Sequence, residues 1–438
     1  MVAQNAYKHM KKVFKQFVVR ILEWEAKRVI SRYKPKVVAV VGSVGKTSTK
    51  DAIATALSIS YRVGKSKKSY NSEFGVPLAI LGAESGAGDV FRWTHILFDG
   101  FLLGLFDHEY PEILVLEVGA DRPGDILRTA GWIKTDVVVA TVYGDVPVHI
   151  EYFGSREELV HEDREILKTL KPEGTLIVNA DDEASLSFVE VWQGAVKKVS
   201  LQKGDIVGRQ YQIEIGDDEF PEGFSVLVEV GGVSTPVRMH HVLGEQHIYP
   251  LLIAGGVASV FDIEMPKAMQ ALARHETPLG RMKIIKGIHG TCILDDTYNA
   301  APAAVKAGLI ALRNTKVKGR KIAVLGDMME LGVHSIEQHK KIGRLAASVC
   351  DILITSGVRS MTMANEALEA GMKAESVTHV EDAYKAGEKL KDILKAGDII
   401  LVKGSQSMRM ERAIEQIMAE PTRKAELLVR QDGEWEGR

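Results

Sequence analysis

The chain has few of the features that mark secreted, membrane-spanning or nucleic-acid-binding proteins. Its two cysteines, Cys292 and Cys350, are far apart and match no metal-binding spacing. We therefore expect no disulfide framework and a reducing, cytoplasmic compartment. No uninterrupted apolar run reaches about 18 residues, and no apolar core with a cleavage site follows the basic N-terminus, so we expect neither a spanning helix nor a secretory signal. The net charge of −2 argues against a general nucleic-acid binder.

The composition is typical of a globular protein with more than one domain. Hydrophobic residues make up 45% of the chain and charged residues 26%, which are ordinary proportions for water-soluble proteins. A length of 438 residues exceeds what one hydrophobic core usually holds, so we expect two or three domains.

Residues 37–59, VVAVVGSVGKTSTKDAIATALSI, join a β-branched run, a glycine-containing loop and an Ala-rich helical pattern. Glycines let backbone N–H groups close round an anion, and the positive end of the helix dipole adds to the attraction. Lys46 is placed to reach the outer phosphates of a nucleotide, and the Thr47 hydroxyl to bind Mg²⁺. The strict pattern has a glycine where Val40 stands. The residues predicted to contact phosphate are Gly42, Ser43, Val44, Gly45, Lys46, Thr47 and Ser48.

Residues 1–36 carry ten Lys or Arg residues against two Glu, a local net charge of +8. Their apolar residues recur near helical spacing. This predicted helix either packs on the domain that follows or rests on an anionic membrane surface, which would make the protein peripheral to the membrane. Residues 87–111 form a second apolar segment, interrupted by Gly100 and Gly104 and too short to span a bilayer. We favour mutual packing of the two segments, with membrane contact as the alternative.

Two apolar runs downstream are typical of buried parallel strands that end in polar residues. Residues 113–119 contain Glu117 near their end, and residues 136–142 are followed by a loop that reaches His149. An acid inside an apolar strand is costly unless it is paired or bound to a metal. Ligands of open α/β sheets collect at the carboxyl ends of strands. Glu117 and His149 are therefore candidate metal ligands beside the phosphate loop.

The second half of the chain predicts a β-meander at 204–240, a linker at 278–280 and a second α/β unit beyond it. The strands of that unit are expected within 284–296, 321–328, 351–357 and 398–405, separated by helical segments. We expect an α/β fold: a central parallel sheet of the P-loop ATPase type with a β-meander insert, then a C-terminal Rossmann-like domain. The predicted boundaries are a basic helix, a central domain, a C-terminal domain and a polar, frayed tail: 1–36, 37–278, 279–420 and 421–438.

From about residue 37 to 418 these segments resemble the Mur ligase family, most closely its dipeptide-adding members. The motifs that carry the resemblance are GSVGKTST (42–49), YNSEFGVP (70–77), LEVGADRPGDI (116–126), HIEYFGS (149–155), NADD (179–182), LGRM (279–282), DDTYNAAP (295–302), LGDMMELG (325–332) and VKGSQSM (402–408). The resemblance implies that a muramoyl-peptide-like carboxylate takes the γ-phosphoryl group of ATP. The amine of an amino acid or dipeptide then displaces phosphate to form an amide, in the synthesis of a cell-wall precursor.

The resemblance also assigns roles to the residues around ATP. Lys46 stabilises the transferring phosphoryl group. Thr47 and Glu117 hold one Mg²⁺, and Glu117 with His149 holds a second. Arg281 contacts the γ-phosphate from the interdomain hinge. The nucleotide ribose lies against Asp296.

Contacts with the other substrates are implied in both halves of the chain, at Asn71, Asn299, Asp327, His339, Lys403 and Ser405. Two of these have an ordinary structural alternative. Asn299 is then a turn residue, and His339 a histidine on a helix face.

The chain departs from the family pattern at its second metal and at the adenine. The family's carbamylated lysine, fourteen residues after the metal histidine, is Asp163 here. Either Asp163 reaches the second metal, or Glu162 or Glu165 substitutes for it, or Asp163 is an ordinary surface acid. Where the family has His-Asn before the next helix, this chain has Gln246 and His247, and we assign the adenine contact to His247.

The family's N-terminal UDP-binding domain has no counterpart in this sequence. We expect either a partner protein to supply that recognition or the acceptor to differ, and a lipid-linked acceptor would suit the basic N-terminus. Two other functions stay open. One is a ligase similar to folylpolyglutamate synthase, which also lacks that domain, and the other is a non-catalytic, ATP-binding relative.

Overall fold

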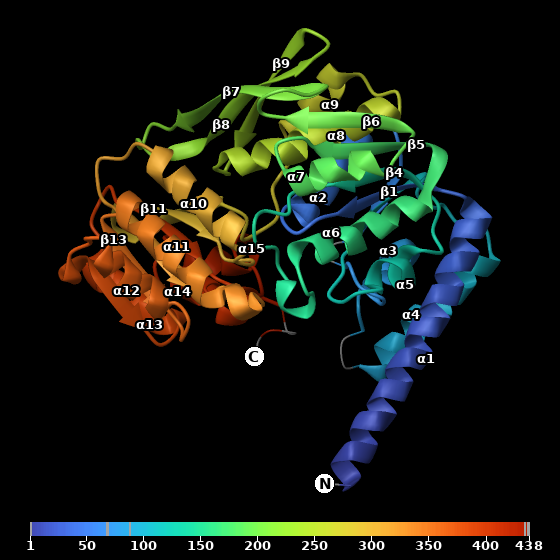
Figure 1. Cartoon of the computed structure of the whole chain (residues 1–438), viewed down its shortest axis with the longest axis horizontal. Helices are drawn as coiled ribbons and strands as arrows, with labels where there is room; N and C mark the ends of the chain where they lie inside the picture. Colours follow the sequence, from blue (N-terminus) through green and yellow to red (C-terminus); the bar gives the residue numbers. More distant parts are fainter. Residues whose placement is uncertain (1, 67–69, 87–88, 433–434, 436–438) are drawn as a thin grey trace.

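The structure, a computed structural model, describes residues 2–66, 70–86, 89–432 and 435, with side chains from Gln16 onward. Its strands form a nine-stranded and a six-stranded sheet (Figure 1). The strands are β1 (Lys36–Val41), β2 (Val63–Lys65), β3 (Ile113–Glu117), β4 (Thr135–Ala140), β5 (Leu170–Asn179), β6 (Ala195–Ser200), β7 (Ile206–Ile215), β8 (Pro221–Val230), β9 (Val233–His240), β10 (Lys283–Gly287), β11 (Thr291–Asp296), β12 (Lys321–Gly326), β13 (Ile352–Ser356), β14 (Val377–Val380) and β15 (Ile399–Lys403).

Helices connect and cover these sheets. The α-helices are α1 (Val2–Tyr33), α2 (Lys46–Leu57), α3 (Gly75–Leu81), α4 (Val90–Leu105), α5 (Asp125–Ala130), α6 (Arg156–Arg164), α7 (Glu183–Leu186), α8 (Ile248–Val260), α9 (Met265–Leu272), α10 (Pro302–Asn314), α11 (Ser335–Val349), α12 (Met361–Glu369), α13 (Ala383–Ile393), α14 (Glu411–Glu415) and α15 (Lys424–Leu427). Short 3₁₀ turns lie at Ile150–Tyr152, Glu165–Thr169, Ser187–Glu190, Glu245–His247, Ile288–Gly290, Gly332–His334, Ala374–Ser376, Gln406–Met408 and Pro421–Arg423.

The larger sheet has the strand order β2-β3-β1-β4-β5-β6-β7-β8-β9. Its strands are parallel as far as β7, and β7, β8 and β9 are antiparallel. Strand β1, which leads into the phosphate loop, lies between β3 and β4. The ends of these three strands therefore meet at one edge, where parallel sheets bind ligands. The predicted meander is present and extends the central sheet.

The smaller sheet has the order β10-β11-β15-β12-β13-β14, with β10 antiparallel to β11 and the other strands parallel. The predicted α/β fold is confirmed. One local expectation was wrong, because residues 284–296 form two hairpin strands with no α-helix between them. Gly287 and Gly290 flank the turn. A Cβ at Gly287 would lie 2.2 Å from the Thr291 hydroxyl oxygen, and Gly290 has φ 67°, a left-handed conformation that favours glycine.

Helices α1 and α4 pack on each other and on α3 (Figure 1). Val18 and Leu22 of α1 share a buried cluster with Leu78 of α3 and Ile96 of α4. The predicted packing of the two apolar segments is therefore present. Within the part of the chain that the structure describes, no helix is long and apolar enough to cross a membrane.

The two sheets are joined by more than the covalent linker. Val242, just after β9, forms an antiparallel bridge with Lys283 at the start of β10. The Leu243 N–H donates to the Met282 carbonyl at 3.2 Å, and the Ile284 N–H donates to the His241 carbonyl at 3.0 Å. The loop after β9 and the first strand of the smaller sheet are therefore held side by side.

Residues 421–432 pack against the smaller sheet, so the expectation of a frayed tail was wrong for them, while residues 433, 434 and 436–438 of the predicted tail lie outside the described residues. Leu428 and Val429 are buried. The Arg430 guanidinium lies 2.7 Å from the Glu411 carboxylate, and Glu411 is fully buried. A polar composition hid this anchor, because the basic residue that looks solvent-exposed in the sequence neutralises a buried acid.

Candidate active site

The phosphate loop has the backbone that its glycines predict. Gly42 has φ 130°, and a Cβ there would lie 2.1 Å from the Thr141 hydroxyl oxygen. Gly45 precedes α2 with φ 87°, a left-handed conformation that favours glycine. The N–H groups of Ser43 and Val44 donate to the Val142 carbonyl, which ties the loop to the end of β4. The first N–H groups of α2 have no partner within the helix and can bind an anion.

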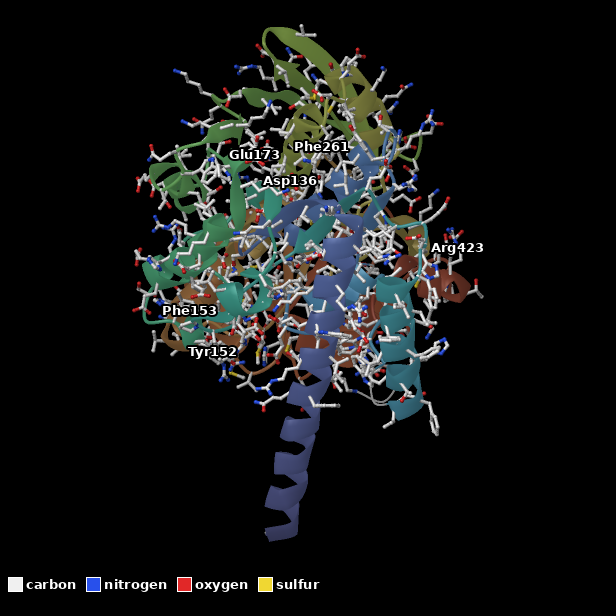
Figure 2. The ribbon with its side chains drawn as sticks, turned by 90° about the vertical axis from the view of Figure 1, so that its right-hand side faces the viewer. Asp136, Tyr152, Phe153, Glu173, Phe261 and Arg423 are labelled. Atoms are coloured by element: carbon white, nitrogen blue, oxygen red, sulfur yellow. The ribbon has the colours of Figure 1, made fainter. Side chains whose placement is uncertain are left out.

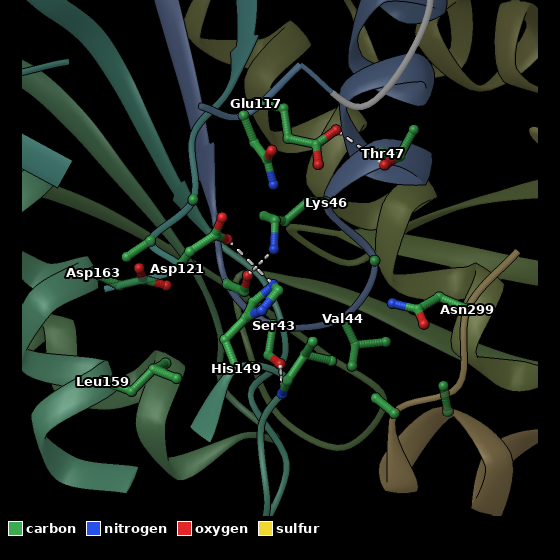
Figure 3. A pocket seen from close by; sticks show the side chains of 18 of the residues that line it. Ser43, Val44, Lys46, Thr47, Glu117, Asp121, His149, Leu159, Asp163 and Asn299 are labelled. Carbon is green, nitrogen blue, oxygen red and sulfur yellow. Dashed lines mark hydrogen bonds and ion pairs between the residues drawn. The ribbon is translucent and has the colours of Figure 1, made fainter. Parts of the chain in front are cut away.

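A first cavity lies over this loop and the N-terminus of α2 (Figure 3). The Thr47 hydroxyl donates to the Glu117 carboxylate at 3.0 Å, and the Lys46 ammonium donates to the Gly42 carbonyl. Glu117 is the last residue of β3 and pairs in register with Val40. The sequence-predicted residues that line this cavity are Gly42, Ser43, Val44, Gly45, Lys46, Thr47, Asn71, Glu117, His149, Asp163, Arg281 and Asn299.

His149 lies on the far side of this cavity, in a left-handed conformation with φ 67°. Its Nδ1 is 2.9 Å from the Glu330 carboxylate of the smaller-sheet domain, and its Nε2 is 3.5 Å from Asp121. The hydrogen bond with His149 lowers the pKa of Glu330. His149 therefore connects the two domains across the cavity.

Asp163 is buried and lines the same cavity. Its carboxylate accepts a hydrogen bond from the Tyr143 hydroxyl at 2.9 Å. Burial raises the pKa of Asp163 to about 6, against the opposing effects of Lys46 and Tyr143. Asp163 is therefore not an ordinary surface acid.

The neighbouring acids of α6 and the following turn face other partners. The Glu162 carboxylate accepts from the backbone N–H groups of Gly124 and Ile126 at 2.8 and 2.9 Å. Glu165 pairs with Lys168. Of the three acids considered for the carbamate position, Asp163 is the one that lines the cavity.

A second, more apolar cavity adjoins the first and shares Val44, Gly45, Arg281 and Ala304 with it. The sequence-predicted residues that line it are Val44, Gly45, Ser48, His247, Arg281, Asp296 and Lys403. The His247 Nδ1 and the Arg281 Nε are buried and have no hydrogen-bond partner among the described residues. Burial, then the nearby Arg281 charge, lowers the pKa of His247 to about 3, so the imidazole is neutral. These two side chains can therefore accept or donate to a ligand.

A buried ion pair closes one side of the second cavity. The Lys403 ammonium lies 2.6 Å from the Asp296 carboxylate and donates to the Asn299 carbonyl at 2.8 Å. Burial raises the pKa of Asp296 and lowers that of Lys403, and each opposes the shift of the other. The Arg281 guanidinium lies over the Tyr298 ring, 4.2 Å from its centroid. Arg281 is therefore stacked where the two cavities meet.

Three predicted substrate contacts lie in the smaller-sheet domain and line neither cavity. Their side chains accept from backbone N–H groups: Asp327 from Ser360 at 2.7 Å, His339 from Met328 at 3.1 Å and Ser405 from Met329 at 2.9 Å. These bonds hold the loop after β12. A role for Asp327, His339 or Ser405 in substrate binding stays a prediction.

The sequence reasoning did not single out three residues of the first cavity or its wall. Asp121 and Glu330 contact His149, and both stand in motifs that had been recognised, 116–126 and 325–332. Both residues follow apolar strands, and this position alone could have marked them as candidates for the ligand-binding edge of a sheet. Tyr143 directly follows the predicted strand at 136–142, but nothing in its local pattern distinguishes it from a core aromatic residue.

No three His, Cys, Asp or Glu side chains converge as a metal site anywhere in the described residues. Thr47 and Glu117 are together, whereas His149 contacts Asp121 and Glu330. A hydroxyl and a carboxylate at the mouth of a phosphate loop are ligands that suit Mg²⁺ completed by phosphate oxygens and water. The donor set at Thr47 and Glu117 therefore fits Mg²⁺.

Comparison with known families agrees with this geometry. The Mur ligase middle domain matches residues 99–258, and the Mur ligase glutamate ligase domain matches residues 280–406. These segments cover well over half of the chain and include strands of both sheets. The chain belongs to the Mur ligase family. The predicted class of activity, an ATP-dependent, ADP-forming ligase in peptidoglycan precursor synthesis, is confirmed with it.

Individual Mur ligases match over most of their length. The UDP-N-acetylmuramoyl-tripeptide–D-alanyl-D-alanine ligase of Bacillus subtilis is 27% identical over 402 residues, which cover 91% of this chain and 79% of that protein. The MurF ligase of Thermotoga maritima, solved with ADP, is 25% identical with a TM-score of 0.74, covering 91% and 83% of the two chains. Folylpolyglutamate synthase of Mycobacterium tuberculosis shares the fold at 14% identity and a TM-score of 0.60, covering 88% of this Mur ligase and 92% of that chain. It is a more distant neighbour.

Proposed function

We propose that this Mur ligase uses ATP to join the amine of D-alanyl-D-alanine to the carboxylate of a muramoyl-tripeptide-like acceptor, on the cytoplasmic side of the cell. The observation that carries the proposal is a phosphate loop with Lys46 and Thr47 beneath two cavities that meet at Arg281. The amine and the acceptor are those for which its relatives are named. The reduced state expected of Cys292 and Cys350, together with the use of ATP, supports a cytoplasmic site.

ATP fits with its phosphates in the first cavity and its base in the second. The loop N–H groups and Lys46 bind the outer phosphates. The unpaired Nδ1 of neutral His247 accepts a hydrogen bond from the adenine amino group. Asp296, held by Lys403, accepts from the ribose hydroxyls. Arg281 stands between the cavities, where its free Nε can donate to the γ-phosphate.

We assign Mg²⁺ to the first cavity. Thr47 and Glu117 would hold one ion, and Glu117, His149 and Asp163, which line the same cavity but do not converge among the described residues, stay candidates for a second. Bound Mg²⁺ neutralises the charge that builds up on the transferring phosphoryl group and on the acyl oxygen. A built-in carboxylate at Asp163 supplies the negative charge that a carbamylated lysine supplies in the family pattern.

The reaction has two steps, transfer of the γ-phosphoryl group and attack by the amine, and side chains of the first cavity position the reactants for both. An oxygen of the acceptor carboxylate attacks the γ-phosphorus, and the bond to the bridging oxygen breaks with release of ADP. The amine nitrogen then attacks the acyl carbon, phosphate leaves with the electrons of its C–O bond, and the nitrogen loses a proton. Lys46 and Arg281 stabilise the negative charge. Asn71 and Asn299, which line the first cavity, are placed to bind the acceptor and the amine.

Phosphate release from ATP with a UDP-muramoyl tripeptide and D-alanyl-D-alanine tests the reaction. We expect release to require both substrates and to be lost in Lys46→Ala, with the amide product identified by mass spectrometry. Release that needs a folate and glutamate would identify a folylpolyglutamate synthase. ATP binding without release for any pair would support a non-catalytic relative.

The N-terminal helix bears on where in the cell the enzyme works. We propose that residues 1–36 keep this reaction close to a membrane surface, because they carry a net charge of +8 on a helix.

A further inference from the structure

Helix α4 has two apolar faces, and only one of them packs on the protein. Ile96, Gly100 and Gly104 are buried. On the other side the exposed fractions of the large side chains are 88% for Phe91, 57% for Phe98, 40% for Phe101 and 44% for Leu105. These four recur at intervals of seven, three and four residues, so they lie on one face of the helix. A surface helix normally turns a polar face to water.

Helix α1 continues this apolar face. Phe17 and Trp24, seven residues apart, are 60% and 48% exposed. The Arg28 guanidinium lies 4.7 Å from the Trp24 ring and 5.8 Å from the Phe101 ring, so it connects the two helices. Figure 2 shows α1 and α4 side by side on one face of the molecule. We call Phe17, Trp24, Phe91, Phe98, Phe101 and Leu105 the α1–α4 surface.

The N-terminal part of α1 is positively charged, whereas Asp99 and Asp107 are exposed acids in and just after α4. Residues 1–22 contain no acid and five basic residues, Lys8, Lys11, Lys12, Lys15 and Arg20. At helical spacing, the sequence places the four lysines on one helix face. The apolar residues Met10, Phe14, Phe17 and Ile21 fall on the opposite face. The N-terminal part of α1 extends well beyond the rest of the molecule (Figure 1). Basic and aromatic residues in this arrangement are typical of interfacial helices.

We propose that the α1–α4 surface docks on an anionic lipid bilayer, with its aromatic side chains at the acyl boundary and the lysines on lipid phosphates. This inference extends the contact proposed for residues 1–36 to α4 and does not depend on the ligase reaction. A second copy of the chain is a poorer occupant, because a two-fold contact would place the basic helix of one copy against that of the other. Neither helix would cross the bilayer.

Co-sedimentation of the full chain with vesicles tests the docking. We expect binding to vesicles of phosphatidylcholine with phosphatidylglycerol and much weaker binding to phosphatidylcholine alone. Binding to the anionic vesicles should weaken as salt is raised, because the lysine contacts are screened. Changing Lys8, Lys11, Lys12 and Lys15 together to Gln should remove the preference for anionic lipid.

The apolar part is tested by a triple variant, Phe91→Ser with Phe98→Ser and Phe101→Ser, which should bind anionic vesicles about tenfold more weakly or worse. The matched control, Val191→Ser with Ile215→Ser and Val233→Ser, removes apolar side chains of 57%, 48% and 65% exposure elsewhere on the surface. The control should bind as the unmodified chain does. Circular dichroism and the phosphate-release rate without vesicles establish that each variant is folded.

Three results would overturn the proposal. The first is an unmodified chain that ignores anionic vesicles. The second is a phenylalanine variant that binds as well as the control. The third is a light-scattering measurement in which the chain is a dimer and the phenylalanine variant a monomer, which would make the surface a contact between copies. Failure of ligation alone leaves vesicle binding unchanged, so the two proposals fail separately.

Discussion

His247 shows how a buried side chain without a protein partner can point to a ligand. Its Nδ1 is unpaired among the described residues, and burial beside Arg281 lowers its pKa to about 3. A neutral imidazole has one donor and one acceptor nitrogen, so the unpaired Nδ1 is available to a ligand, and the ring does not titrate in the physiological range. The sequence pointed to position 247, but the free nitrogen and the neutral state required the fold.

We predict that His247→Phe raises the KM for ATP about tenfold, the equivalent of one lost hydrogen bond. Because the folded-state pKa lies below its unfolded value of about 6.5, His247 becomes charged only near pH 3. His247 should therefore contribute no titration to the KM for ATP between pH 5.5 and 8, and the pH profiles of His247→Phe and of the unmodified chain should run parallel. Steady-state kinetics at several pH values measure both effects. His379→Phe, in the smaller sheet and outside both cavities, is the control.

The negative charge of Asp163 can be tested by a substitution that keeps the size of the side chain. Asp163→Asn keeps the size of the side chain and an acceptor for the Tyr143 hydroxyl but removes the negative charge. We expect kcat to fall about 100-fold or more, with the KM for ATP within a few-fold, because the charge is needed for phosphoryl transfer. Activity of the unmodified chain should also be unaffected by removal of CO₂. An unchanged kcat in the Asn variant would exclude Asp163 from the site. Glu165→Gln, the neighbour that pairs with Lys168, serves as the control.

Much of the site was predictable because its residues stand at the ends of apolar strands in a recognisable order. Glu117 and the loop from Gly42 to Ser48 are the clearest cases. What the sequence left open at 162–165 was decided by side-chain direction, since Glu162 faces two backbone N–H groups and Asp163 faces the cavity. Residues 162–165 lie at the C-terminal end of α6, where helix boundaries are uncertain by one or two residues. Helical periodicity therefore cannot predict which of these adjacent side chains faces the cavity.

At the level of elements, the contact between α1 and α4 contains a buried acid. Glu25 is 3% exposed, and its Oε2 has no hydrogen-bond partner among the described residues. It lies where Gly100 leaves room, since a Cβ at Gly100 would come 2.4 Å from that oxygen. Burial raises the pKa of Glu25 to about 7, and the nearby Arg28 opposes the shift. The helix pair therefore holds a carboxyl that prefers to be neutral.

The stability of this helix pair should consequently depend on pH. The folded pKa of Glu25 is raised above its unfolded value, so the folded state binds more protons between about pH 4.5 and 7. The resulting stabilisation is complete below that window and is lost as the pH rises through 7. We predict that Tm falls from pH 5 to pH 8 and that Glu25→Gln reduces this fall by keeping the site neutral. Thermal melts followed by circular dichroism measure it. Glu23→Gln, on the exposed side of the same helix, should leave the slope unchanged.

The buried parallel strands were the most predictable elements, because β1, β3 and β4 are apolar on both faces and bounded by polar residues. Among the elements that escaped prediction, two have a clear physical reason. Strand β14, Val377–Val380, has four residues and is half-buried throughout, so it carries too little pattern to separate from a loop. The hairpin of β10 and β11 was hidden because Gly287 and Gly290 turn the chain inside one apolar run.

At the scale of the whole molecule, ion pairs join the two domains in addition to the bridge between Val242 and Lys283. His149 meets Glu330 at 2.9 Å, and Lys318 meets Glu219 at 2.6 Å. The second pair is exposed, and such pairs contribute little. Interfaces between domains of one chain commonly allow relative motion. The His149 contact is therefore the one whose loss should change the spacing of the domains.

We predict that Glu330→Ala increases the radius of gyration measured by small-angle X-ray scattering in the absence of ATP. The loss of the contact with His149 removes the polar link across the first cavity, so open arrangements become more populated. Saturating ATP should reverse the increase, because the nucleotide contacts both domains. Glu337→Gln, an exposed residue of α11, should scatter as the unmodified chain does. A radius that Glu330→Ala leaves unchanged would show that other contacts hold the domains together.

The bridge between Val242 and Lys283 has a mechanical consequence for such motion. A body attached at one point can swing in any direction, whereas a body attached at two adjacent points turns like a door about the line between them. The covalent linker and the hydrogen bonds of the bridge are two such points. Arg281, two residues before Lys283, stands beside this line and would move little as the domains turn. The contact proposed between its guanidinium and the γ-phosphate would therefore persist while the domains open and close.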